Sequence, residues 1–323
     1  MTRSVPSALV LAGFLAGGFS SAQTPPSTST VDVVVTDLAR HLVEGLTAAD
    51  FEVTEKGRPV PVVSCTDVDA RAGGRAYLIA IDAVHLTPQG AARVQPVLEE
   101  FIRDFLNPRD RAAVAWLTPS PRMSDFTSDR QRLLQIVDAV SDDARSRGAA
   151  AAGGIGLEFG SVDSLDATGQ TLSALSAALA RGRRAVGHPF AVLLISGGLP
   201  ATESEPRATS DARRALFAEA ARANASIYPI DPAGMSSISS SLAPSEEFEP
   251  AGLAEWASLR LIADRTGGRA IVGRSDLASA YREIVQDSSG YCLITYQSAV
   301  TRSGDVRVRV KRPGVKVRTG KNN

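Results

Sequence analysis

Two residues that can bind a metal ion or move a proton stand close together in the first third of the chain. Asp82 ends the apolar run "AYLIAID" (76–82), and His85 follows it in "AVHL". A carboxylate at a strand end suits a divalent cation with oxygen ligands, and an imidazole beside it suits proton transfer. Each also has a structural explanation, because Asp82 can accept hydrogen bonds from loop amides and His85 can be an ordinary loop residue. The sequence favours the structural explanations.

The segments around Asp82 predict a parallel sheet. The continuous apolar run at 76–82 is typical of a strand covered on both faces, and Thr87-Pro88 predicts the N-cap and first residue of a helix. Strand-like and helix-like segments then alternate, which predicts an α/β domain over 71–288 with helices on both faces of a mostly parallel sheet. Further strands are expected at 111–118, 190–196, 225–231 and 269–273, helices at 128–140, 171–184, 211–224, 253–268 and 275–288, and surface loops at 146–164 and 234–252.

The two ends of the chain have a different period. Apolar and polar residues alternate there, with turn signals between the runs, which is typical of antiparallel strands. We expect the N-terminal segment (31–70) and the C-terminal segment (289–319) to pack together as one small antiparallel β domain, interrupted by the α/β domain. The alternating runs are 31–37, 50–55, 59–65, 291–297 and 305–318.

The two cysteines test this arrangement. Cys65 ends a strand-like run before the α/β domain, and Cys292 lies in the first run after it. If the two β segments share one layer system, these cysteines can approach within bonding distance. The alternative is two buried thiols in separate strands, and the sequence leaves both open.

Composition and the N-terminus indicate an exported protein. The 323 residues carry 35 basic and 35 acidic side chains, so no overall charge points to nucleic acid. Residues 1–22 read as a signal peptide with cleavage near Ala22, followed by a linker over 23–30. The apolar stretch of this peptide is too short to span a bilayer. We therefore expect a periplasmic or extracellular protein that is not an integral membrane protein.

The order of elements and several phrases resemble the von Willebrand factor type A (VWA) domains, in particular the VWFA-related group described from acidobacterial proteins. The likeness runs from residue 31 to about residue 318. It implies a Rossmann-like VWA domain joined to β segments, and a role in binding proteins or other macromolecules without an established reaction. The matching phrases are "VDVVVTD…VEGLTAADFEVTEKGRPVPV", "YLIAIDAVHLTPQGAARVQPVLEEFI", "IYPIDPAGM", "LRLIADRTGGRAI" and "YCLITYQ".

The resemblance also implies where a metal ion would bind. VWA domains of the metal-binding kind hold Mg²⁺ through Asp-x-Ser-x-Ser after the first strand, a Thr from a second loop and an Asp after the central strand. Here the first Asp is Asp82, and the Thr would be Thr168 or Thr171. The remaining positions have lost their oxygen ligands, so we expect a degenerate site without Mg²⁺ or another cofactor. Those positions hold Val84 and Leu86 in place of Ser, and Gly197 in place of Asp.

We therefore expect a non-catalytic protein that binds a protein or another envelope macromolecule at the carboxyl ends of its parallel strands. One alternative is an unrecognised hydrolase that uses the Asp82/His85 cleft, although no hydrolase motif is present and His41 and His188 have no Ser or Cys partner nearby in sequence. Another is a structural envelope protein that docks through its basic C-terminal strand. The basic residues of that strand are Arg302, Arg307, Arg309, Lys311, Arg312, Lys316, Arg318 and Lys321.

Overall fold

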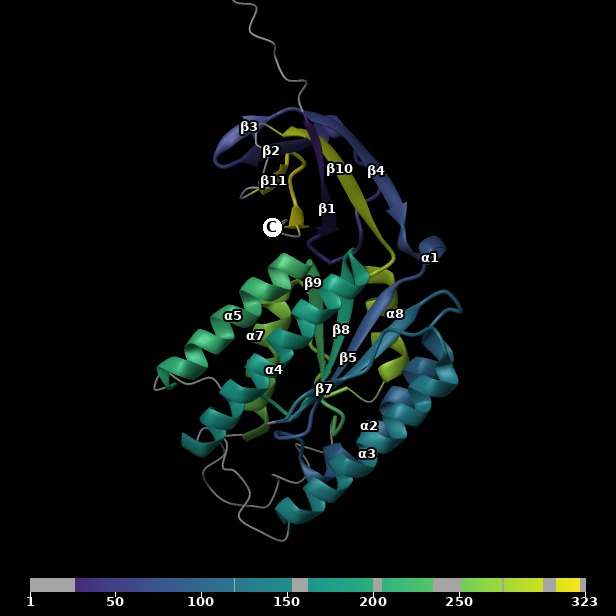
Figure 1. The fold of residues 1–323 in the computed structure, drawn as a ribbon, viewed down its shortest axis with the longest axis vertical. Helices are drawn as coiled ribbons and strands as arrows, with labels where there is room; N and C mark the ends of the chain where they lie inside the picture. Colours follow the sequence, from purple (N-terminus) through teal and green to yellow (C-terminus); the bar gives the residue numbers. More distant parts are fainter. Residues whose placement is uncertain are drawn as a thin grey trace, which may run out of the picture.

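The computed structural model describes residues 27–118, 120–152, 162–199, 205–234, 251–274, 276–298 and 306–319. The chain forms an α/β domain and a smaller β domain stacked on one end of it (Figure 1). The expected signal peptide, 1–22, lies outside the described residues. None of the helices in the described ranges is long and apolar enough to cross a membrane.

The α/β domain is built on a five-stranded sheet with the order β7-β6-β5-β8-β9. β5 pairs in parallel with β6 and β8, β8 pairs in parallel with β9, and the short β7 is antiparallel to β6. Every residue of β5 is buried, as its continuous apolar run predicts. The chain crosses to opposite sides of β5 to form β6 and β8, so the carboxyl end of β5 lies at a topological switch point. The strands are β5 (Ala76–Asp82), β6 (Arg111–Leu117), β7 (Arg122–Met123), β8 (Phe190–Ile195) and β9 (Ala225–Ile230).

Helices cover both faces of this sheet (Figure 1). Alternate residues of β5 point to opposite faces, so Ile79 packs in a core with α2, α3 and α8, while Leu78 packs in a core with α4, α5 and α7. Thr87 is the N-cap of α2, as the sequence predicts, and its hydroxyl accepts a hydrogen bond from Gly90 N at 3.0 Å. The helices are α2 (Pro88–Glu100), continued by a π-helix η2 (Phe101–Phe105), α3 (Arg130–Ala152), α4 (Val162–Val186), α5 (Arg207–Ala223), α7 (Ala251–Thr266) and α8 (Leu277–Asp287).

The β domain is assembled from both ends of the chain. One antiparallel sheet has the order β12-β1-β10-β4 and the other β11-β2-β3, so each contains strands from the N-terminal and the C-terminal segment. Buried residues of the two sheets share one hydrophobic core. The elements are β1 (Ser27–Asp37), η1 (Ala48–Asp50), β2 (Phe51–Glu55), β3 (Arg58–Val60), β4 (Val62–Asp69), α1 (Ala70–Gly73), β10 (Gly290–Ser298), β11 (Val306–Val310) and β12 (Val315–Thr319). The expected fold class, an α/β domain between β segments that form an antiparallel β domain, is confirmed.

Several predicted boundaries differ from the structure. β1 begins at Ser27, inside the expected linker, because residues 27–30 pair with the far end of β10. The expected loop 146–164 is helical up to Ala152 and again from Val162, and residues 153–161 lie outside the described ranges. Of the expected strand 269–273, only Ile271 forms a bridge, to Ile230.

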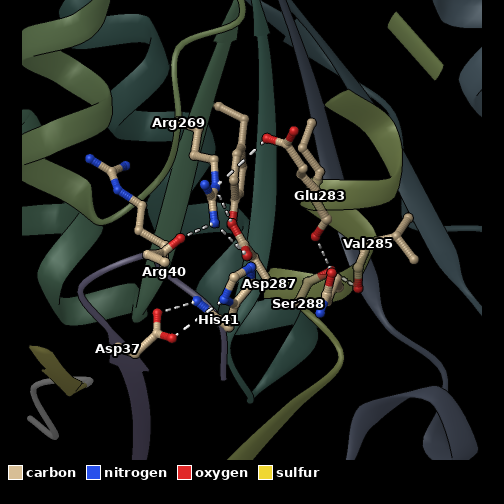
Figure 2. Close-up of polar contacts among 12 residues, drawn as sticks. Asp37, Arg40, His41, Arg269, Glu283, Val285, Asp287 and Ser288 are labelled. Carbon is tan, nitrogen blue, oxygen red and sulfur yellow. Dashed lines mark hydrogen bonds and ion pairs between the residues drawn. The ribbon is translucent and has the colours of Figure 1, made fainter. Parts of the chain in front are cut away.

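The β domain covers the amino ends of the parallel strands. Arg269 spans the junction, since its Nη2 donates to Ala39 O at 2.9 Å and its Nε donates to Asp287 Oδ2 at 3.1 Å (Figure 2). Asn224, the residue before β9, donates from Nδ2 to Asp32 O at 3.0 Å. The opposite end of the sheet, where β5, β6, β8 and β9 finish and their following loops begin, is called the carboxyl edge below.

Cys65 and Cys292 are joined as a disulfide, with Cα atoms 5.8 Å apart. They lie on neighbouring strands, since Cys65 pairs with Ile294 and Cys292 pairs with Asp67 between β4 and β10. The bond therefore links the N-terminal β segment to the C-terminal one across the whole α/β domain.

Replacing both cysteines with serine is expected to destabilise the protein. A cross-link that closes so long a loop restricts the unfolded chain and contributes up to about 5 kcal/mol in the chain-entropy model. Urea unfolding of the double variant and of the reduced wild-type protein should therefore show similar losses. A wild-type protein whose stability is unchanged by reductant would contradict this expectation.

Candidate functional site

Asp82 ends β5 at the carboxyl edge, and its side chain is fully buried. The backbone N–H groups of Val84 and His85 donate to Oδ1 at 3.1 and 3.3 Å, and Ser196 Oγ donates to Oδ2 at 2.7 Å. His85 Nδ1 lies 3.0 Å from Oδ1 and 2.9 Å from Oδ2. Every one of these contacts can bring a donor to the carboxylate, which is how a buried charged acceptor is satisfied.

The His85 imidazole fills the space between Asp82 and helix α4. Its side chain is only 8% exposed, and its Nε2 lies 3.1 Å from the hydroxyl of Thr168, which is fully buried. Because a carboxylate only accepts hydrogen bonds, we assign the proton on Nδ1. Nε2 accepts a hydrogen bond from the Thr168 hydroxyl when the imidazole is neutral and donates to it when the imidazole is protonated. Carboxylate, imidazole and hydroxyl form one continuous chain across the carboxyl edge.

Ser196 ties β8 into the same network. It follows β8, donates to Asp82, and accepts a hydrogen bond from Gly198 N at 3.1 Å. Its side chain is completely buried. Ser196 was not among the residues expected at this site, although the run "LLIS" places a hydroxyl directly after an apolar strand and one residue before the expected aspartate position at Gly197.

The other expected site residues do not join this network through their side chains. Val84 contributes its backbone N–H, and Leu86 packs against the hydrophobic core beneath α2. The Thr171 hydroxyl is buried in α4 and has no hydrogen-bond partner within the described parts of the chain. Of the residues expected at the site, the structure brings together Asp82, His85 and Thr168.

Gly197 is held by close contact with the loop after β5. A Cβ atom added at Gly197 would lie 2.3 Å from the His85 backbone carbonyl oxygen, a separation that real Cβ atoms do not show. An aspartate at this position, as in metal-binding VWA domains, would therefore force the loop that carries His85 to move.

The arrangement does not fit a Mg²⁺ site. Mg²⁺ requires near-octahedral oxygen coordination at short distances, but donors already occupy both oxygens of Asp82, and an imidazole separates it from Thr168. Across the described residues, no group of three or more His, Cys, Asp or Glu side chains is placed to hold a metal ion.

A second pair of carboxylates lies further along the carboxyl edge. Asp231 follows β9, is buried, and accepts hydrogen bonds from Ala233 N and Trp256 Nε1, both at 2.9 Å. Glu255 of α7 is half-buried against Gly198, where an added Cβ would lie 2.7 Å from Glu255 Cβ. Burial, followed by the charge of Asp231, raises the pKa of Glu255 to about 7.

The remaining histidines lie away from Asp82. His41 Nδ1 is 3.3 Å from Asp37 Oδ2 at the end of β1 (Figure 2), and His188 Nδ1 is 2.9 Å from Pro189 O, just before β8. Both positions are on the side of the sheet where its strands begin.

The basic C-terminal run does not form one cationic strand. The turn after β11 divides it, and β11 and β12 belong to different sheets. Arg309 contacts Glu52 at 3.3 Å and Arg312 contacts Asp50 at 2.9 Å, so part of the positive charge is neutralised within the β domain. Arg302 and Lys321 lie outside the described residues.

No protein-family model and no curated protein matches the chain. Among solved structures, an aerotolerance-related membrane protein from Bacteroides fragilis is similar with 13% identity and a TM-score of 0.39, over 66% of this chain and 98% of that one. The manganese-loaded TRAP protein of Plasmodium vivax gives 12% identity and a TM-score of 0.34, over 81% of this chain and 100% of that one. The N-terminal domain of TFIIH p34 gives 12% and 0.29, over 66% and 96%. Likenesses this weak carry no argument about function.

Gly197→Ala is expected to destabilise the protein by about 1–3 kcal/mol, the usual cost of overpacking, because the loop of His85 must shift to admit one methyl group. Gly73→Ala is the matched control, since an added Cβ there meets nothing within 4 Å. Denaturant unfolding compares the two variants. Equal free energies of unfolding for the two variants would show that the loop after β5 can shift without loss of stability.

Glu255→Gln is expected to stabilise the protein at pH 8 and to have little effect near pH 4. The folded-state pKa of about 7 exceeds the ordinary value of 4.5, so ionised Glu255 is disfavoured in the folded protein. Stability is then lost as the pH rises from about 4.5 through 7, and the loss is fully present above that range. After allowance for the partial exposure of the Glu255 side chain, the variant's gain in the free energy of unfolding at pH 8 is about 1 kcal/mol. A gain of the same size at both pH values would contradict the assignment.

Proposed function

We propose that this chain is an exported, non-catalytic binding protein of the VWA type, which takes a protein or another envelope macromolecule on its carboxyl edge without a bound metal ion. The observation that carries the proposal is the closed network around Asp82. Four hydrogen-bond donors, one of them the nearly buried imidazole of His85, satisfy the Asp82 carboxylate. This carboxylate therefore has a structural role at the carboxyl edge. Binding there depends on the shape and polarity of the surrounding loops.

The position of the β domain supports the carboxyl edge as the binding surface. The amino ends of the parallel strands are covered through Arg269, Asn224 and their partners, whereas loops after strands gather at the other end. A groove of about 580 Å³ lies there beside Thr168, between α4, α5 and the segment after β6. Its lining is mostly apolar, with hydroxyl and amide groups and the Asp166 carboxylate among the apolar side chains, which suits a partner surface that is largely apolar and makes a few hydrogen bonds. The lining includes Thr118, Gln170, Ser173 and Thr209.

Export is supported by two features. The N-terminal residues have the pattern of a signal peptide, and the disulfide between Cys65 and Cys292 is a bond that persists in oxidising compartments such as the periplasm or the cell exterior.

Hydrolysis is the second candidate function, because one observation favours it. Asp82, His85 and Thr168 are connected in the order of a catalytic triad, with the carboxylate on Nδ1 and a hydroxyl on Nε2. Against this, Thr168 is completely buried within α4, so a substrate carbonyl has no access to its oxygen. A fluorophosphonate probe that labels Thr168 would establish a hydrolase, and we expect no labelling.

Site-specific photo-crosslinking tests the proposed binding surface. A benzophenone side chain at Gln170, exposed in the groove, is expected to yield a reproducible adduct with one macromolecule in cells that export the protein. The matched control is Arg184, exposed on the same helix, 14 residues and therefore about 21 Å away toward the covered end of the sheet.

The comparison of the two positions decides the outcome. Adducts from position 170 that are absent from position 184 support the carboxyl edge. Equal adducts from both positions, or adducts from position 184 alone, would contradict it.

A further inference from the structure

A pocket of about 500 Å³ lies between the two domains, on the side of the sheet opposite the carboxyl edge. Strands β1 and β12 form one wall, and the start of β9 with the ends of α5 and α7 forms the other. The volume is within the range of small-molecule sites. Nothing in the proposed function uses this pocket.

The lining of the pocket has more positive than negative charge. Both of its carboxylates are neutralised, since Arg40 Nη2 lies 2.6 Å from Asp264 and Arg269 Nε lies 3.1 Å from Asp287. Within the described residues, the three remaining lining cations have no carboxylate at ion-pair distance. These cations are Arg265, Lys316 and Arg318.

Arg318 is the most constrained of these cations. Its side chain is half-buried over Gly267, and burial lowers its pKa, as happens to a cation that lacks a close counterion. Of the five N–H donors in its guanidinium, one bond is made, from Nη1 to Asn224 O at 2.9 Å. The other four donors have no hydrogen-bond partner within the described residues.

Two further polar groups of the lining are unsatisfied. The hydroxyl of Ser226, a residue only 3% exposed, and the Nη1 of Arg40 are both buried, and neither has a hydrogen-bond partner in the described structure. Leaving such groups unpaired costs free energy, which a ligand acceptor would recover. Arg40 Nη1 can only donate, so it points to the same chemistry as Arg318, a hydrogen-bond acceptor, and the Ser226 hydroxyl is able to donate to the same acceptor.

We propose that this interdomain pocket binds a small oxyanion, a molecule with a phosphate or carboxylate group. Arg318 and Lys316 of β12 provide the charge, and Ser226 of β9 and Arg40 after β1 provide further donors. Val34 offers apolar surface for the rest of the molecule. Because its contacts come from both domains, the ligand stabilises their junction.

Calorimetry with pyrophosphate and with citrate, on the wild-type protein at low salt, tests the proposal. At least one probe is expected to bind saturably, and more weakly as salt is added. Loss of a charge-assisted hydrogen bond in Arg318→Met should weaken binding about tenfold, and Lys316→Met should weaken it by a smaller factor. The matched control is Arg132→Met, an exposed arginine of α3, which should leave the affinity unchanged.

The two probes identify the anionic group, because pyrophosphate alone indicates a phosphoryl ligand and citrate alone a carboxylate. If Arg318→Met does not fold, Lys316→Met decides, since the Lys316 side chain is exposed and its backbone pairing with Thr36 is kept in the variant. The proposal is overturned if neither probe binds up to about 10 mM, where a site of even millimolar affinity is saturated. It is also overturned if Lys316→Met binds the probe as tightly as the wild type and Arg318→Met, where it folds, does so too.

Discussion

The position of β10 between β1 and β4 constrains the rest of the structure. β4 precedes the α/β domain and β10 follows it, so the chain must leave for that domain and return from it at the same end of the parallel sheet. The connections are short, since α1 and two residues join β4 to β5, and two residues join α8 to β10. Such links hold the β domain against the amino ends of the strands, at the end of the sheet opposite the carboxyl edge.

The two ends of the sheet consequently carry different chemistry. At the amino ends, Arg40 of the β domain pairs with Asp264 of α7 at 2.6 Å, and within the α/β domain Arg75 forms a fully buried ion pair with Asp110 at 2.6 Å between the starts of β5 and β6. At the carboxyl edge, Asp82 is satisfied within its own loop, by Ser196 and by His85. The first arrangement fixes the domains, and the second satisfies a buried carboxylate with hydrogen-bond donors.

The local elements of this fold were predictable because their signals are local. The apolar run of β5 and the Thr87 N-cap are read directly from neighbouring residues. Ser27–Thr30 were expected to be a linker, since a Ser/Thr run shows its strand conformation only through pairing with Thr295–Ser298. The continuous run at 305–318 likewise gave no sign that its halves join different sheets. The site followed the same rule, because Asp82 could be placed at a strand end but Ser196 is brought to it by pairing of β5 with β8.

A crystal grown with Mn²⁺ tests the central claim, that an imidazole rather than a cation bridges Asp82 and Thr168. The structure predicts no anomalous scattering peak within about 2.5 Å of the Asp82 oxygens, a distance that includes first-row metal–oxygen bonds. It also predicts electron density for the His85 ring between the carboxylate and the hydroxyl. An anomalous peak coordinated by Asp82 and Thr168, with His85 turned away, would contradict the account.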